Sequence, residues 1–166
     1  MCLCFSSTVI GRLLFARRKK LMSEEKVRIG RDRYLAQNNL SLNSYTERKF
    51  PVYFFKWPIW LPNPGFLPVH DLHHVVTGYR TGLVGEAEIS AYELRGGCGS
   101  VMIFILCAGA IFFGLFVAPK RIWKAWRDSR GARNLYRTDI PYESLLEMSL
   151  GDLRQHLGLP RNGFAS

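Results

Sequence analysis

The chain has 166 residues, of which 48% are apolar and 22% charged, and its formal net charge is +10 at pH 7. This balance argues against global disorder, and the length suits one domain with a real core rather than two. The positive charge predicts an anionic partner. Membrane lipid is the expected partner and nucleic acid is not. The sequence contains no recognisable nucleic-acid-binding module, and its basic residues flank an apolar run.

Residues 1–45 are expected to form a basic, flexible N-terminal segment, followed by a single helical domain over 46–166. The first 21 residues carry five basic residues and no acidic one, and the apolar residues come before the charges, the reverse of a secretory signal. Two interpretations fit this segment equally: an organelle transit peptide, or an assigned start codon that lies upstream of the true one, for which Met22 is the candidate. At most one short helix is expected here, over 24–36.

Four cysteines match neither a disulfide framework nor a zinc ribbon and indicate a reducing compartment. Cys98 and Cys107 lie in an apolar stretch, where a free cysteine usually behaves as a small buried hydrophobe. Cys2 and Cys4 are candidate acylation sites.

From Phe50 to Val69 the chain alternates aromatic residues with five prolines, which exclude a long helix or a central strand. We expect an irregular segment that either packs over the core as a loop or lies in a membrane interface, where Trp and Tyr are favoured. No β pattern of any length is predicted.

The remaining pattern is helical. Helices are expected over 69–79, 86–94 and 120–130, the last amphipathic and basic, and over 142–157 with a break near Gly151. The predicted fold class is therefore all-α: a compact helical domain with one long apolar helix and a proline/aromatic-rich irregular segment.

Residues 98–118 contain no charge over 21 residues, which is long enough to span a bilayer. Basic residues follow this run closely, and the region before Phe50 is also basic, so a single span would carry one basic segment across the membrane. A helix that lies in the plane of one leaflet avoids that conflict and is the preferred interpretation. A true span and a buried helix of a soluble protein remain alternatives.

The residues that point to chemistry are His70, Asp71, His74 and Glu86. His70 and His74 are four apart, so on a helix they share one face and can chelate one ion. Asp71 is a candidate third ligand, or the acceptor that fixes a histidine tautomer. Glu86 follows a glycine turn that can fold it back towards the histidines. Two imidazoles with one or two carboxylates suit Zn²⁺ best, with Fe²⁺ or Mn²⁺ as alternatives.

The same spacing also arises by chance on ordinary polar helices, so both a metal site and an ordinary polar helix face agree with the spacing alone. Glu93 shares the helical face of Glu86 and is a reserve ligand. His73 points away from the pair and is expected at the surface or hydrogen-bonded to a ligand from behind. His156 is expected to be an exposed histidine. Zinc-protease, HD phosphohydrolase and ferritin-like templates each lack an element here.

The run from His70 to Tyr79 with Glu86 resembles the coenzyme Q biosynthesis protein four family, whose signature is H-D-x-x-H-(x)11-E. His70, Asp71, His74 and Glu86 match every fixed position. A C-terminal stretch that ends in Arg154-Gln155-His156-Leu157-Gly158 is similar to the family's R-x-x-L-G pattern, so the resemblance covers roughly residues 67–160. The chain departs from the family in its proline-aromatic segment and in the length of its apolar run.

The resemblance implies an all-helical, membrane-associated protein of ubiquinone biosynthesis. It implies a divalent metal held by His70, Asp71, His74 and Glu86, which act in the oxidative decarboxylation of a prenylated hydroxybenzoate-type precursor. The expected partners are this prenylated aromatic lipid, membrane lipids, other ubiquinone-biosynthesis proteins and a second copy of the chain in a homo-oligomer. The expected place is a mitochondrial or bacterial inner membrane, peripheral or monotopic. The alternative function is a non-catalytic lipid-binding scaffold that organises the biosynthetic complex.

Overall fold

The computed structural model describes residues 23–54, 57–63 and 65–164 together with Leu14, Arg17 and Leu21, apart from the side chains at 50 and 52–54. The fold is mostly helical. Its elements are α2 (Val27–Gln37), η1 (Leu42–Tyr45), β1 (Lys49–Phe54), β2 (Trp57–Pro62), α3 (Leu67–Thr77), α4 (Leu83–Gly96), α5 (Val101–Val117), α6 (Pro119–Asp128), η2 (Leu135–Arg137), α7 (Tyr142–Glu147) and α8 (Leu150–His156).

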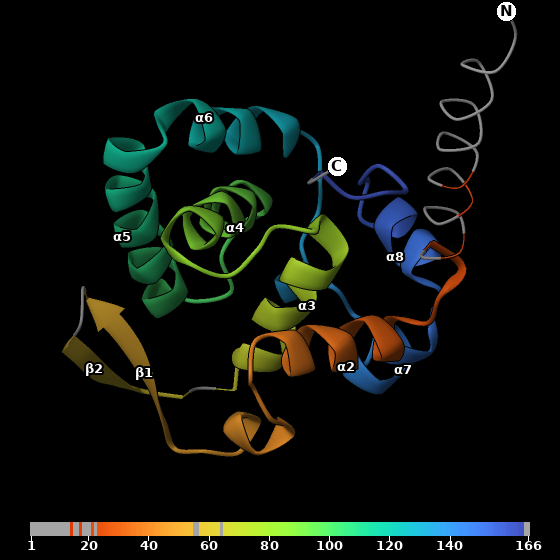
Figure 1. Cartoon of the computed structure of the whole chain (residues 1–166), viewed down its shortest axis with the longest axis horizontal. Coiled ribbons are helices and arrows are strands. Elements are labelled where there is room, and N and C mark those ends of the chain that lie inside the picture. The colour runs from red at the N-terminus through yellow and green to blue at the C-terminus, as the bar shows by residue number, and fades with distance from the viewer. Residues whose placement is uncertain are drawn as a thin grey trace, which may run out of the picture.

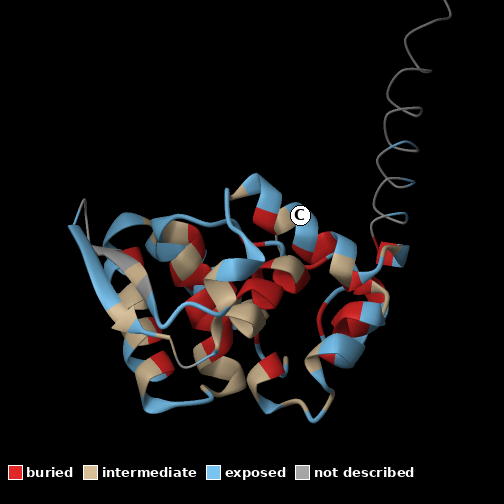
Figure 2. Ribbon diagram, turned by 90° about the horizontal axis from the view of Figure 1, so that it is seen from below, coloured by how far each residue is buried: buried red, intermediate tan, exposed pale blue. Residues whose placement is uncertain are grey.

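The helices pack in two groups that meet at α3 and α4 (Figure 1). In the first, α5 and α6 pack on α4, and Ala87, Ile89 and Ala91 of α4 meet Ile122 and Ala125 of α6. In the second, α2, α7 and α8 surround α3 with a leucine-rich core. The buried residues therefore concentrate in the middle of the molecule, and the hairpin at one end is largely exposed (Figure 2).

The helices predicted over 69–79, 86–94 and 120–130 are present as α3, α4 and α6. The C-terminal amphipathic segment is divided as expected, although the break falls at Met148–Ser149 rather than at Gly151. The helix expected over 24–36 is α2. Its Val27 and Leu35 are buried, and Val27 belongs to the leucine-rich core, so this part of residues 1–45 packs with the helical domain.

The prediction of an irregular segment without β structure is wrong. Residues 49–62 form an antiparallel two-stranded hairpin, in which Pro51 pairs with Trp60 and Pro58 with Tyr53. Pro62 pairs with Lys49. All three prolines stand in the non-hydrogen-bonded pairs of the antiparallel ribbon, where the N–H of a residue points away from the partner strand. A two-stranded ribbon has only edge strands, so the missing N–H groups of these prolines break no ladder. The described Trp57, Ile59 and Trp60 are exposed, so they do not pack over the core.

The long apolar helix is shorter than expected. α5 has 17 residues, because Gly97 and Ser100 hold the preceding residues outside it and it ends before Ala118. Among the described residues, no helix has the length and apolar character needed to cross a membrane. The proposals for a transit peptide, an early start codon and acylation at Cys2 and Cys4 concern residues almost all outside the described part of the chain.

Candidate metal centre

Two helices position the site, and α3 supplies both histidines. Pro68 stands in the first turn of α3, where its missing N–H is harmless, and Gly78 ends the helix in the left-handed conformation at φ 81°. His70 and His74 lie one turn apart on one face, with ring centroids 5.0 Å apart and planes at 85°. Their Nε2 atoms therefore point to the same region of space, as the spacing predicted.

The start of α4 brings Glu86 to these rings. A Cβ atom at Gly85 would lie 1.7 Å from the backbone oxygen of Arg80, so the tight turn before α4 tolerates only glycine there. Glu86 Oε2 lies 3.3 Å from His70 Nε2, and Glu86 Oε1 lies 3.4 Å from His74 Nε2. His70, His74 and Glu86 each offer one ligand atom within 4.8 Å of the others, so this group could hold a metal ion.

The hydrogen bonds behind the rings settle which nitrogen faces this point. His74 Nδ1 lies 3.0 Å from the backbone oxygen of Tyr79, and because a carbonyl only accepts, Nδ1 carries the proton. In the neutral ring the lone pair of His74 is then on Nε2, which is buried and has no hydrogen-bond partner. The ring of Tyr34 stacks on His74 at 5.2 Å and restrains its tilt. A buried, unpartnered acceptor aimed at a carboxylate fits a cation between them.

Glu93 shares a face of α4 with Glu86 and lies behind the His70 ring. Its Oε1 accepts from His70 Nδ1 at 2.8 Å, so the lone pair of His70 also falls on Nε2 when that ring is neutral. Glu93 is almost completely buried and receives further hydrogen bonds from His73, Tyr136 and Cys107. It was a reserve ligand on sequence grounds, and the geometry places it one layer behind the ligand group.

The charges at the site reinforce one another. Burial opposes charge on His70, but the carboxylates of Glu93 and Glu86 outweigh it and raise the pKa of His70 well above its usual value. Burial alone would raise the pKa of Glu86, yet the neighbouring His70 and His74 rings lower it to about 2. The pKa of Glu93 is likewise held well below its usual range, since His70 and His73 outweigh the cost of burial.

Asp71 is not in the ligand group. It is one position further round α3, and its Oδ2 accepts a hydrogen bond from the hydroxyl of Tyr45 at 2.7 Å. Burial, the largest influence, raises the pKa of Asp71 against the opposing effect of that hydrogen bond. Of the four residues expected to bind metal, the structure therefore brings together His70, His74 and Glu86 and turns Asp71 towards a tyrosine.

Other residues around the site were missed or misplaced. His73 is completely buried, so its expected surface position is wrong. Its ring contacts Glu93, which lies behind the ligand group, and not a ligand directly. Tyr34, Tyr45 and Tyr136 carried no local signal, because their contacts are long-range in sequence. Cys107 is buried as expected, and His156 is exposed as expected.

The donor set permits a defined chemistry. Two imidazoles and one carboxylate are the ligands of many catalytic zinc sites and of non-haem iron sites, and both leave coordination positions open. Glu86 is 38% exposed and His70 is 19% exposed, so the centre is reachable from one side. The residues present fit a divalent ion, and its identity is left open between zinc, iron and manganese.

Comparison with protein-family models, with curated proteins and with solved structures finds no match for this chain.

Proposed function

We propose that this protein is a metal-dependent enzyme of ubiquinone biosynthesis that acts at a membrane surface on a prenylated hydroxybenzoate-type precursor. The observation that carries the metal centre is the convergence of His70 Nε2, His74 Nε2 and a Glu86 oxygen within 4.8 Å of one another. The reaction class rests on the resemblance of this H-D-x-x-H-(x)11-E pattern to the coenzyme Q biosynthesis protein four family.

In the proposed reaction the bond between the ring and its carboxyl group breaks with loss of CO₂, and a hydroxyl takes its place. The substrate loses two electrons overall. With the hydroxyl oxygen taken from water, dioxygen accepts these two electrons with two protons and leaves as hydrogen peroxide. A bound divalent ion would anchor the ring carboxylate or phenolate and stabilise the negative charge that develops there. His70 and His74 direct their Nε2 atoms towards that position, where each would offer a lone pair once its ring is neutral, and the partly exposed Glu86 marks the open side.

The test is genetic and chemical. In cells that lack this protein, the prenylated precursor that still bears its ring carboxylate should accumulate, and the wild-type chain should remove it. His74→Ala should fail to do so, whereas His156→Ala should restore synthesis, because His156 is exposed and outside the site. Full restoration by a double variant, His70→Ala with His74→Ala, would overturn the enzymatic role.

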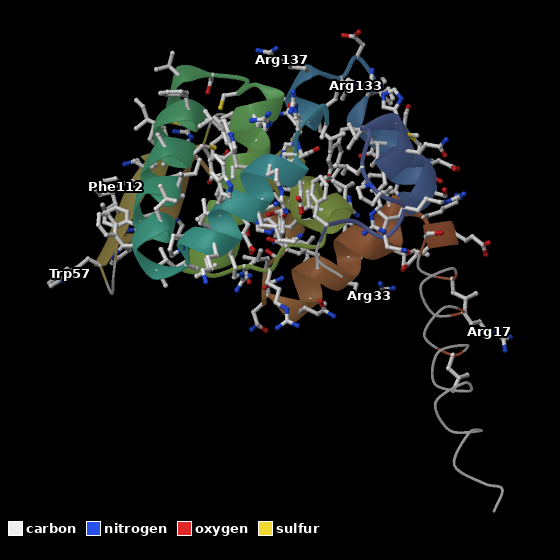
Figure 3. The ribbon with its side chains drawn as sticks, turned by 90° about the horizontal axis from the view of Figure 1, so that it is seen from above. Arg17, Arg33, Trp57, Phe112, Arg133 and Arg137 are labelled. Carbon is white, nitrogen blue, oxygen red and sulfur yellow. The ribbon has the colours of Figure 1, made fainter. Side chains whose placement is uncertain are left out.

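The membrane part of the proposal is supported by an apolar end of the molecule. In Figure 3 the labelled Trp57 and Phe112 both project at the same end, far from Arg33. Large apolar side chains are exposed along α5, on the hairpin and on α6: Val101, Phe104, Ile105, Phe112, Phe113, Leu115, Phe116, Val117, Trp57, Ile59, Trp60 and Trp123. Exposed large apolar side chains in this number favour an interaction site.

The charges beside this end favour lipid as the partner. Lys120, Arg121 and Lys124 are exposed on α6, the helix that carries the exposed Trp123. Basic residues next to exposed aromatic residues suit a helix that lies at the surface of an anionic membrane. Such a position would bring the centre near a substrate whose polyprenyl tail is dissolved in the bilayer.

The exposed apolar end also favours a second candidate, a non-catalytic lipid-binding scaffold that gathers other ubiquinone-biosynthesis proteins. The two candidates differ in their need for metal. A scaffold would keep its function in His70→Ala and His74→Ala variants that fold and bind membranes, and an enzyme would not.

A further inference from the structure

We propose that Glu93 is the positioning residue of this centre. Its carboxylate holds the His70 ring with Nε2 towards Glu86 and supplies the second negative charge that balances a divalent ion. This inference rests on the proposed metal centre and adds to it a residue outside the four-residue signature.

The first support is where Glu93 lies. It follows Glu86 by seven residues on α4, so both carboxylates are on the face of α4 that meets α3. Its side chain is 2% exposed, whereas that of Glu86 is 38% exposed. The Asn134 side chain donates to the Glu93 backbone oxygen at 2.9 Å, which fixes the helix at this point. Glu93 is therefore an interior group and Glu86 an outer one.

The second support is that both oxygens of Glu93 are engaged. Oε1 lies 2.8 Å from His70 Nδ1, 2.6 Å from His73 Nδ1 and 3.0 Å from the Tyr136 hydroxyl. Oε2 accepts from Cys107 Sγ at 3.3 Å. Each oxygen of Glu93 therefore already accepts at least one hydrogen bond, and Glu93 lies outside the group that could hold the ion. Glu93 is thus an acceptor for the ligands and not a ligand itself.

The third support is a tautomer that the backbone dictates. The N–H of Leu135 donates to His73 Nε2 at 2.9 Å, so that nitrogen is an acceptor and the proton of the neutral His73 ring is on Nδ1. His73 Nδ1 must then donate to Glu93 Oε1, so this oxygen carries no proton. His70 Nδ1 meets the same oxygen and donates to it as well, which leaves Nε2 for the ion.

This arrangement has the form of a carboxylate–histidine–metal relay, in which the group behind a ligand fixes its tautomer, its orientation and its basicity. His70 has a carboxylate behind it, and His74 has the Tyr79 carbonyl. With Glu86 and Glu93 both ionised, one negative charge lies at the ion and the second lies directly behind His70. The buried centre is then neutral when it is loaded, which lowers the cost of burying the ion.

The test compares two isosteric substitutions in one helix. Glu93→Gln should weaken Zn²⁺ and Co²⁺ binding, measured by titration calorimetry on the full chain, by roughly 10–100-fold. Glu88→Gln is the matched control: Glu88 is also a buried glutamate of α4, but its carboxylate pairs with Arg121. It should change the affinity by less than about threefold, within the small effects usual away from a site.

A second measurement needs no variant. In zinc-loaded wild-type protein, long-range ¹H–¹⁵N correlation spectra should show His70 and His73 protonated on Nδ1, with His70 Nε2 unprotonated. A merely structural role for Glu93 would not dictate that signature. Wild-type affinity in Glu93→Gln, or zinc bound through Nδ1 of His70, would overturn the role of Glu93 and leave the metal centre intact. Absence of binding in the wild-type chain would overturn both.

Discussion

His73 lies with its Nδ1 atom 2.6 Å from Oε1 of Glu93, and both side chains are almost completely shielded from solvent. The two residues come from different helices, α3 and α4, at the place where the two helical groups of the fold meet. The polar layer behind the candidate metal centre is therefore also part of the core. Changes in this layer affect packing and ligand geometry together, so a variant in it is interpreted only when the protein is shown to fold.

Loss of a histidine ligand should abolish stoichiometric metal. Wild-type protein dialysed against zinc should retain about one ion per chain by elemental analysis. His74→Ala should bind at least roughly 100-fold more weakly, because loss of outer partners alone weakens such sites 10–100-fold. Retention of one ion per chain by a folded His74→Ala variant would contradict the site.

Asp71→Asn should leave metal binding nearly unchanged. The Asp71 carboxylate accepts from the Tyr45 hydroxyl and is outside the ligand group, and an asparagine oxygen can accept the same hydrogen bond. Zinc affinity within about threefold of wild type is expected from a change away from the ligands. If calorimetry instead shows a loss like that of His74→Ala, Asp71 is a ligand as the family resemblance implies.

Metal binding should release a proton near neutral pH. Burial disfavours the charged His70 ring, but Glu93 and Glu86 raise its pKa well above the usual value, so the ion-free ring is protonated at pH 7. A divalent ion must displace the Nε2 proton, and this competition fades as pH rises towards the raised pKa. The apparent affinity should therefore increase with pH between 6 and 8, by up to about tenfold per unit.

Titration calorimetry at pH 7 in buffers of different ionisation enthalpy measures this directly. The observed heats should differ between buffers by the amount that corresponds to about one proton per ion. Identical heats in all buffers would mean that the ring is already neutral in the ion-free protein.

Phe112→Glu should weaken binding to vesicles that contain anionic lipid. Phe112 is 56% exposed at the apolar end, and loss of one buried large apolar side chain costs roughly 1.5–3 kcal/mol, or about 10–100-fold in partitioning. Ile29→Glu is the matched control, since Ile29 is 52% exposed on α2 in the other helical group. Sedimentation of vesicles measures both, and equal effects in the two variants would exclude a specific membrane face.

Two glycines of α5 should respond oppositely to alanine. A Cβ at Gly114 would lie 2.3 Å from Ala87 Cβ, so Gly114→Ala forces α5 away from α4 and should destabilise the fold by about 1–3 kcal/mol. A Cβ at Gly109 meets nothing within 4 Å, and Gly109→Ala should stabilise the helix by up to about 1 kcal/mol. Denaturant unfolding gives both values. A stabilised Gly114→Ala would mean that the two helices are not in close contact.

The helical fold could be predicted because local signals bracket its elements. Pro68 and Gly78 mark the two ends of α3, and the apolar spacing between them shows the buried face. The hairpin could not be predicted, because prolines argue against a strand unless that strand is at the edge of a sheet. Whether a strand is at an edge depends on how many strands pair. The sequence shows the prolines but not the size of the sheet.

The site divides in the same way. His70 and His74 share a face by spacing alone, and the glycine turn before Glu86 suggested the rest. The Asp71 carboxylate accepts a hydrogen bond from Tyr45, 26 residues away, and the buried His73 ring accepts one from a backbone N–H 62 residues away. Contacts over such separations leave no periodicity in either segment, so they were visible only in the folded chain.

The convergence of acceptors between α3 and α4 has a consequence for the lifetime of the protein. An ion held there would link α3 and α4, where the two helical groups meet. Its binding free energy would add to the stability of the folded state. At a free ion concentration one hundred times the Kd, this gain is about 2.7 kcal/mol. Cells starved of the metal would then contain less of the protein, through faster turnover, before any shortage of catalysis was felt.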